Sequence, residues 1–166
     1  DALRVEGKLE SGTFALPGDV SSQFITGLLY ALPLLDGDSE ILLTTSLESR
    51  GYVDMTLDAL AKFGIRVEPA ERGWHIPGGQ TYRPQKATVE SDYSQAAFYY
   101  AARLLGSPVQ IQGLNSDSAQ GDAVILEFYR ALNCPGEVEL DVSQCPDLVP
   151  PLAAMAALRP GQMTRI

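Results

Sequence analysis

Segments that read as strands alternate with segments that read as helices along the whole chain, and this alternation is the feature that most limits its fold. Helix-like segments place apolar residues three or four positions apart, whereas strand-like segments place them at every second position or in short runs. Helices are predicted over residues 21–35, 52–63, 93–105, 119–132 and 147–158. Strands are predicted over residues 3–7, 12–16, 40–45, 65–68, 73–77, 87–90, 109–113, 137–140 and 162–166. Such alternation predicts an α/β (α+β) fold.

A polar module that leads into an apolar helix recurs along the chain. Residues 18–23 read Gly-Asp-Val-Ser-Ser-Gln, residues 91–95 read Ser-Asp-Tyr-Ser-Gln, and residues 141–147 form a looser copy. Ser22 and Ser94 lie 72 positions apart, and Asp54 and Asp122, at two similar helix starts, lie 68 apart. A period near 70 predicts a βαβαββ unit that is used repeatedly. The alternative is that any protein built from βαβ units looks self-similar in this way.

The restart of this module also predicts a domain boundary. It follows a polar stretch, residues 80–86, and begins at Ser91 and Asp92. We therefore expect residues 1–88 and residues 89–166 to be parts of two different domains, joined by a hinge near Glu90.

The charge balance and the cysteine count argue against several classes of protein. Twelve Lys and Arg face 21 Asp and Glu, which gives a formal net charge of −9. Proteins that bind nucleic acids or acidic membranes gather basic residues on one face, so neither role is expected. Cys134, Cys145 and His75 are too few and too badly spaced for a zinc site, so we expect no metal and two reduced cysteines. Without a long apolar span or an N-terminal signal, a cytoplasmic protein is expected.

A first candidate site lies at the start of the helix predicted over residues 21–35. Asp19 fits the N-cap position, which would place Val20, Ser21 and Ser22 in the first turn. The backbone N–H groups of a first turn lack helical partners, and the helix dipole adds positive potential there. With two hydroxyl groups beside them, these N–H groups could bind a phosphate. The alternative is an ordinary capped helix with solvated serines.

Two further polar clusters lie at the starts of later helices. Residues 44–50 read Thr-Thr-Ser-Leu-Glu-Ser-Arg and follow a predicted strand, at the end where α/β proteins bind ligands. Arg50 could pair with a phosphate or a carboxylate there, or it could be a solvated charge. Asp147 stands at the start of an almost wholly apolar helix, where a carboxylate acts either as a cap or, in a cleft, as a catalytic group.

Four stretches of the chain resemble signature segments of the 5-enolpyruvylshikimate-3-phosphate synthase family, and they run in the family's order. They read Leu-Pro-Gly-Asp-Val-Ser-Ser-Gln-Phe at 16–24, Glu-Ser-Arg-Gly-Tyr-Val-Asp-Met-Thr at 48–56, Ser-Gln-Ala-Ala at 94–97 with Gln-Gly-Asp at 120–122, and Gln-Cys-Pro-Asp-Leu-Val-Pro at 144–150. Each stretch alone would be a weak signal, whereas the ordered set is specific.

This resemblance implies a fold and a reaction. The family builds two domains from repeated βαβαββ units, an arrangement called an inside-out barrel, of which this chain would hold an incomplete part. The implied reaction transfers the enolpyruvyl group of phosphoenolpyruvate to the 5-hydroxyl of shikimate 3-phosphate and releases phosphate, without a metal or organic cofactor. By position, Ser21, Ser22 and Gln23 would hold shikimate 3-phosphate, and Ser49 would contact phosphate. Tyr52 would lie near the sugar ring, and Asp147 would orient and deprotonate the 5-hydroxyl.

The resemblance also implies that important groups lie outside this sequence. The family's early Lys-Ser pair, its Asn-Ala-Gly-Thr loop and an Arg for phosphoenolpyruvate would precede Asp1, and a Lys-Glu-Ser-Asp-Arg segment would follow Ile166. We therefore expect the chain to be inactive alone and to need the remainder of the enzyme as a partner. One alternative is a non-catalytic fragment that only binds shikimate 3-phosphate. Another is the UDP-N-acetylglucosamine enolpyruvyl transferase branch, whose loop cysteine neither Cys134 nor Cys145 matches.

Overall fold

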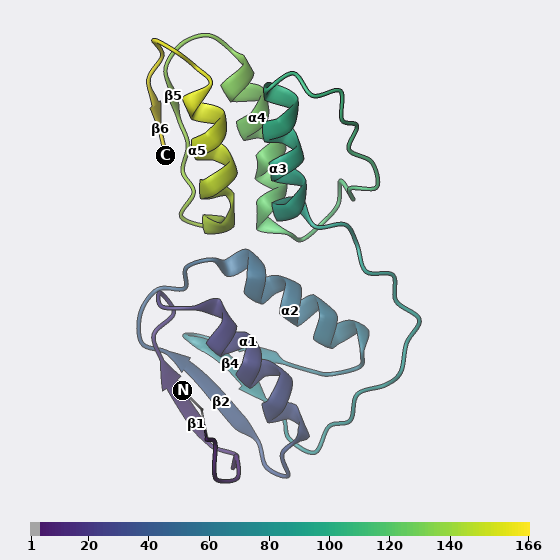
Figure 1. The fold of residues 1–166 in the computed structure, drawn as a ribbon. Coiled ribbons are helices and arrows are strands. Elements are labelled where there is room, and N and C mark those ends of the chain that lie inside the picture. The colour runs from purple at the N-terminus through teal and green to yellow at the C-terminus, as the bar shows by residue number, and fades with distance from the viewer. Residues whose placement is uncertain (1–3) are drawn as a thin grey trace. The chain divides into compact units, whose positions relative to one another are not determined.

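The computed structural model describes residues 4–166, which divide into two compact units. Unit 1 comprises the described residues up to 48 together with residues 56–86, and unit 2 comprises residues 49–55 and 87–166. Helix α2 (Arg50–Lys62) is labelled in Figure 1, and its first turns belong to unit 2 while its remainder belongs to unit 1. The predicted division at residue 88 into parts of two enzyme domains stays a prediction.

Unit 1 is built on a four-stranded mixed sheet. The strands are β1 (Thr13–Leu16), β2 (Ser39–Leu43), β3 (Glu68–Ala70) and β4 (Gly73–Ile76), in the spatial order β1-β2-β4-β3. β1 and β2 are parallel, whereas β4 is antiparallel to both β2 and β3. Helix α1 (Ser22–Ala31) and a 3-10 turn (Leu32–Leu34) connect β1 to β2, and α2 connects β2 to β3. The order of elements from β1 to β4 is therefore β-α-β-α-β-β.

The core of unit 1 forms where apolar residues of the helices meet the sheet. Ile25 and Leu29 of α1 are fully buried, as are Ile41 of β2 and Ile76 of β4. Phe24, in contrast, is 62% exposed and lies outside the buried stripe of α1 that Ile25 and Leu29 form. The hydroxyl groups of Thr26 and Thr56 lie 2.9 Å apart and join α1 to α2 through a hydrogen bond.

Unit 2 packs three helices around one apolar core. They are α3 (Tyr93–Leu104), α4 (Ile125–Asn133), which follows a 3-10 turn (Gly121–Val124), and α5 (Val149–Ala157), which follows a 3-10 turn (Pro146–Leu148). A short parallel pair, β5 (Val138–Glu139) and β6 (Thr164–Arg165), completes the unit. Figure 1 shows α3, α4 and α5 side by side, and the core between them includes Tyr93, Ile125, Leu152 and Met155.

A buried arginine connects the end of α5 to the loop between α4 and β5. Arg159 is 6% exposed, and its guanidinium donates hydrogen bonds to the carbonyl oxygens of Cys134 and Gly136. It also donates to the side chains of Gln162 and Thr164. A buried charge is tolerated when fixed acceptors surround it, so this cation is structural.

Three of the predicted strands are absent from the described residues. Residue 3 lies outside the described part of the chain, and residues 4–7 form no strand. Residues 87–90 and 109–113 are likewise outside any strand. A strand forms only where a neighbouring strand completes its backbone hydrogen bonds. The periodicity of a segment does not show whether such a neighbour exists. The strands predicted over residues 65–68 and 73–77 are present and form a hairpin, but the first of them spans Glu68–Ala70, because the backbone N–H of Ile65 donates to the carbonyl of Leu60 near the end of α2.

The prediction of a mixed α/β fold is confirmed, since helices alternate along unit 1 with the strands of a mixed sheet.

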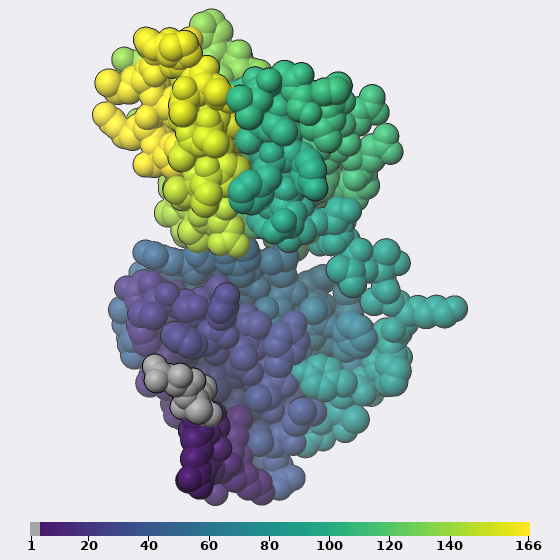
Figure 2. Space-filling model, viewed as in Figure 1, coloured from purple at the N-terminus to yellow at the C-terminus, as the bar shows by residue number. Residues whose placement is uncertain are grey.

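The segment that leads from unit 1 to unit 2, residues 81–90, is exposed apart from a half-buried Tyr82, and it is drawn in teal in the space-filling view of Figure 2. Within residues 4–166, none of the helices has the length and apolar character that a membrane span requires.

Candidate functional site

The start of α1 differs from the sequence prediction by two residues. Ser21, not Asp19, is the N-cap: its backbone is extended, and its hydroxyl accepts a hydrogen bond from the backbone N–H of Gln23 at 3.3 Å. The Asp19 carboxylate instead accepts a hydrogen bond from the Thr45 hydroxyl at 2.7 Å. The first turn therefore begins at Ser22, which is half-buried, and it contains no acidic residue. A first turn without a carboxylate keeps the positive end of the helix dipole available to an anion.

The loops that follow β1 and β2 are joined by hydrogen bonds at the carboxyl ends of these two parallel strands. The backbone N–H of Gly18 donates to the Thr45 hydroxyl at 2.9 Å, and the N–H of Glu48 donates to the Gly18 carbonyl at 3.0 Å. A side chain at Gly18 would meet the carbonyl oxygen of Ser46 at 2.8 Å, so only glycine allows this approach. The predicted clusters around Ser21 and Thr45 are thus neighbours in unit 1.

A cation that sequence reasoning missed lies at this edge of the sheet. Arg72 occupies the turn between β3 and β4, and its guanidinium donates to the carbonyl oxygen of Thr44 at 3.1 Å. The antiparallel pairing of β4 with β2 places that turn beside the end of β2. The strands on either side of this turn were predicted, but the pairing of β4 with β2 was not, and that pairing determines the position of Arg72.

Ser49 adopts a strained backbone conformation immediately before α2. Its φ of 53° lies in the left-handed region, which residues other than glycine rarely adopt and which is enriched at functional sites. Its carbonyl accepts a hydrogen bond from the N–H of Tyr52 at 3.1 Å. The neighbouring Arg50 pairs with Asp54 at 3.4 Å on an exposed face of α2, so part of its charge is already neutralised.

The first turn of α2 is fixed within unit 2 by close backbone contacts. A side chain at Gly51 would lie 3.1 Å from the backbone nitrogen of Gly121, so the two glycines bring the start of α2 against the turn before α4. The N–H of Arg50 donates to the side-chain oxygen of Gln144 at 3.1 Å. These contacts connect three stretches that the sequence analysis had singled out separately.

A phenol and two carboxylates lie together at this point of unit 2. The Tyr52 hydroxyl donates to Asp122 at 3.3 Å, and burial together with the charges of Asp122 and Asp147 raises the pKa of Tyr52 well above its usual range. Burial also raises the pKa of Asp122, which is 3% exposed; the charges of Asp147 and Asp92 add to this effect, and the Tyr52 hydrogen bond opposes it. The carboxyl of Asp122 therefore holds its proton more tightly than an ordinary aspartate does.

Asp147 lies in the 3-10 turn that precedes α5, and its side chain is exposed. The N-cap of that turn is Cys145, which forms no capping bond through its side chain. Burial, followed by the charges of Asp122 and Asp141, raises the pKa of the Cys145 thiol to about 11, so this cysteine stays protonated and unreactive. An exposed carboxylate beside a phenol can accept a proton from a bound hydroxyl.

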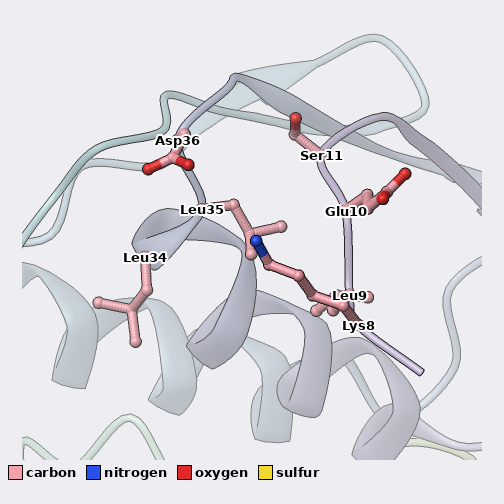
Figure 3. Close-up of a pocket in the computed structure, with 7 residues that line it drawn as sticks. All are labelled: Lys8, Leu9, Glu10, Ser11, Leu34, Leu35 and Asp36. Atoms are coloured by element: carbon pink, nitrogen blue, oxygen red, sulfur yellow. The ribbon is translucent and has the colours of Figure 1, made fainter. Parts of the chain in front are cut away.

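Two cavities of unit 1 are lined by residues other than the predicted site residues. One, of about 440 Å³, is open and is lined by residues 8–11 and 34–36, with the Lys8 side chain extending across it (Figure 3). Another, of about 580 Å³, lies between the end of α2 and Trp74. Residues 4–166 also contain no group of three or more His, Cys, Asp or Glu side chains that could hold a metal ion.

The predicted site residues thus form two groups. Ser21, Ser22 and Gln23 stand at the start of α1 in unit 1, whereas Ser49, Tyr52 and Asp147 belong to unit 2. Asp122, which sequence reasoning did not select, is the most buried member of the second group. Its signal was present in the Gln-Gly-Asp stretch at 120–122, which is one of the segments that resemble the family, but no role had been assigned to Asp122 there.

The polar clusters of this mixed α/β protein lie at strand ends and helix starts, where α/β proteins commonly bind ligands. More specifically, the chain belongs to the EPSP synthase (3-phosphoshikimate 1-carboxyvinyltransferase) family, whose sequence profile matches residues 2–139. The resemblance noted from the sequence is confirmed.

Curated relatives from clostridia agree with this assignment. The 3-phosphoshikimate 1-carboxyvinyltransferase of Clostridium kluyveri is 47% identical over 175 residues, covering 96% of this chain and 41% of the relative. The enzymes of the same name from Clostridium acetobutylicum and Clostridium perfringens strain 13 are 45% and 43% identical, over 96% and 99% of this chain. The chain therefore spans about two fifths of the length of these relatives.

Proposed function

We propose that the chain forms part of a 3-phosphoshikimate 1-carboxyvinyltransferase, which transfers the enolpyruvyl group of phosphoenolpyruvate to the 5-hydroxyl of shikimate 3-phosphate and releases phosphate. The observation that carries this proposal is the cluster in unit 2. Tyr52 and Asp147, to which the resemblance assigned roles in the site, lie far apart in the sequence, yet Asp147 is close enough to act on the Tyr52 phenol. A protein that used the same fold for an unrelated function would not need the side chains of Tyr52 and Asp147 to lie close together.

Each group of residues has a role in this proposal. The first turn of α1, with Ser21, Ser22 and Gln23, holds shikimate 3-phosphate through hydroxyl groups and free backbone N–H groups. Ser49 provides a further phosphate contact, and the Tyr52 ring lies against the sugar ring. Asp147 accepts the proton of the 5-hydroxyl while the hydroxyl oxygen bonds to the central carbon of phosphoenolpyruvate, and the terminal methylene carbon takes up a proton to become a methyl group. Loss of phosphate from the resulting tetrahedral intermediate, together with loss of a proton from that methyl group, then restores the double bond.

The proposal extends to the organisation of the whole enzyme. The β-α-β-α-β-β order of unit 1 would be one copy of a repeated unit of the inside-out barrel type. Residues 1–88 would belong to the domain that binds shikimate 3-phosphate, and residues 89–166 to the second domain. The remainder of the enzyme would be the partner that supplies further cations. The proposed reaction uses neither a metal nor an organic cofactor, and the proposed location of the enzyme is the cytoplasm.

A binding-only role is the second candidate, and the coverage of the relatives supports it. A polypeptide of residues 1–166 corresponds to 41% of the Clostridium kluyveri relative and carries a net charge of −9. Two anionic substrates are held together in a closed site only when cations compensate their charge. Such a polypeptide would then recognise shikimate 3-phosphate without catalysing its conversion.

Phosphate release from the two substrates tests the proposed function. We expect no turnover from the polypeptide of residues 1–166 alone, because losing one preorganised donor already costs roughly a hundredfold in rate. Turnover should appear when the flanking segments of the Clostridium kluyveri relative are supplied as separate polypeptides, and Asp147→Asn should remove it. Activity of the complemented mixture that Asp147→Asn leaves intact would contradict the assigned role of Asp147.

A further inference from the structure

The buried carboxylate of Asp122 has no role in the reaction described above. It is 3% exposed and stands in the turn before α4. Burying a carboxylate is costly unless donors or cations compensate it. The charges that act on it come from Asp147 and Asp92, which are both acidic, and the nearby Cys145 thiol is uncharged. The Tyr52 phenol, at 3.3 Å, is the donor that stabilises its ionised form.

We propose that Asp122 is a positioning residue, which accepts the hydrogen bond of the Tyr52 phenol and so fixes the Tyr52 ring for the sugar ring of shikimate 3-phosphate. This inference rests on the proposed function. Asp147 also acts on the Tyr52 phenol, so the hydrogen bond to Asp122 is one of two carboxylate interactions that orient the Tyr52 hydroxyl.

The backbone contacts around Tyr52 give this hydrogen bond a fixed geometry. Gly51 lies directly before Tyr52, and it packs against the backbone of Gly121, which lies directly before Asp122. The N–H of Arg50 is bound by Gln144, on the loop that leads to Asp147. The backbones that carry the phenol and its acceptor are thus held against each other, so the ring is constrained both at its Cα and at its hydroxyl.

The link between the two side chains can be measured without substrate. We expect a ¹³C-carboxyl NMR titration of the 166-residue chain to show Asp122 losing its proton at higher pH in Tyr52→Phe, because the Tyr52 hydrogen bond lowers the pKa of Asp122. The matched control is Tyr99→Phe, which removes the hydroxyl of an exposed tyrosine on α3. An Asp122 titration that is the same in Tyr52→Phe and in the unsubstituted chain would overturn the proposal.

Calorimetric titration with shikimate 3-phosphate tests the positioning role. Asp122→Ala should weaken binding about fivefold, and the loss in the double variant with Tyr52→Phe should be smaller than the sum of the two single losses, since the Tyr52–Asp122 hydrogen bond is lost in all three. Asp122→Asn keeps an acceptor oxygen and should bind nearly as the unsubstituted chain does. A merely structural role would lower stability without this pattern.

Two results would separate failure of this inference from failure of the proposed function. Additive losses in the double variant, or full affinity in Asp122→Ala, would overturn the positioning role while the unsubstituted chain still binds. Absence of binding by the unsubstituted chain would contradict the proposed function, and the NMR titration would then still decide whether Asp122 holds Tyr52.

Discussion

At the scale of single residues, Asp122 shows how burial and hydrogen bonding compete. Burial favours the neutral acid, and the acidic neighbours Asp147 and Asp92 favour it further, whereas the Tyr52 phenol favours the ionised form. The net result is a raised pKa for Asp122. A group whose pKa is raised by folding stabilises the protein while it is protonated, and that contribution is lost as the pH rises through the folded-state pKa.

This sign leads to a prediction for Asp122→Asn. Asparagine does not titrate. The free energy of unfolding of the Asp122→Asn variant, relative to that of the unsubstituted chain, should therefore grow as the pH rises from about 3.8, the ordinary pKa of this carboxyl, through the folded-state pKa. Above that pKa the difference should level off. The difference cannot change by more than about 1.4 kcal/mol per pH unit for one proton. Urea unfolding of both chains over this pH range measures it. A difference that is constant with pH, or that shrinks as the pH rises, would contradict the burial of Asp122.

At the scale of secondary-structure elements, the glycines of α1 and α2 have opposite effects on stability. A side chain at Gly27, in the interior of α1, would meet no atom within 4 Å, whereas one at Gly51 would lie 3.1 Å from the backbone of Gly121. Helix propensity favours alanine over glycine in both positions. The contact with Gly121 reverses this preference at Gly51, because a backbone atom cannot move aside as a flexible side chain could.

Alanine substitutions at the two glycines separate these effects. Gly27→Ala should raise the free energy of unfolding by up to about 1 kcal/mol through helix propensity. Gly51→Ala should lower it by about 1–3 kcal/mol, the usual cost of overpacking. Denaturant unfolding checks both values. A Gly51→Ala chain that is as stable as Gly27→Ala would show that the approach to Gly121 imposes no constraint.

The elements that depend on local patterns were predicted well, and those that depend on distant partners were not. All five predicted helices are present, because their apolar periodicity follows from the positions of neighbouring residues. Residues 87–90 and 109–113 show strand periodicity but form no strand.

The two similar polar modules also cap their helices differently: Asp92 caps α3, whereas Asp19 bonds to Thr45 and leaves the cap of α1 to Ser21. The candidate site follows the same rule, since motif order indicated Tyr52 and Asp147 but not the buried Asp122.

At the scale of the whole molecule, the acidity of the chain opposes the binding of its proposed anionic ligands. The net charge is −9, and Arg50, the cation nearest in sequence to the predicted phosphate contact Ser49, is paired with Asp54. Recognition of shikimate 3-phosphate by residues 1–166 should therefore be weak and should rely on hydroxyl groups, N–H groups and the helix dipole at the start of α1. Relatives of more than twice this length have room for further cations.

Calorimetric titration of the 166-residue chain with shikimate 3-phosphate tests the central claim most directly. Shikimate without the phosphate serves as the control ligand. We predict measurable binding of the phosphorylated compound alone, and an affinity about fivefold lower in Ser22→Ala with little change in melting temperature. Ser21→Ala, which removes the cap, should instead cost about 1 kcal/mol of stability. Equal binding of both ligands, or a Ser22→Ala chain that loses stability but keeps its affinity, would contradict a phosphate site at the start of α1.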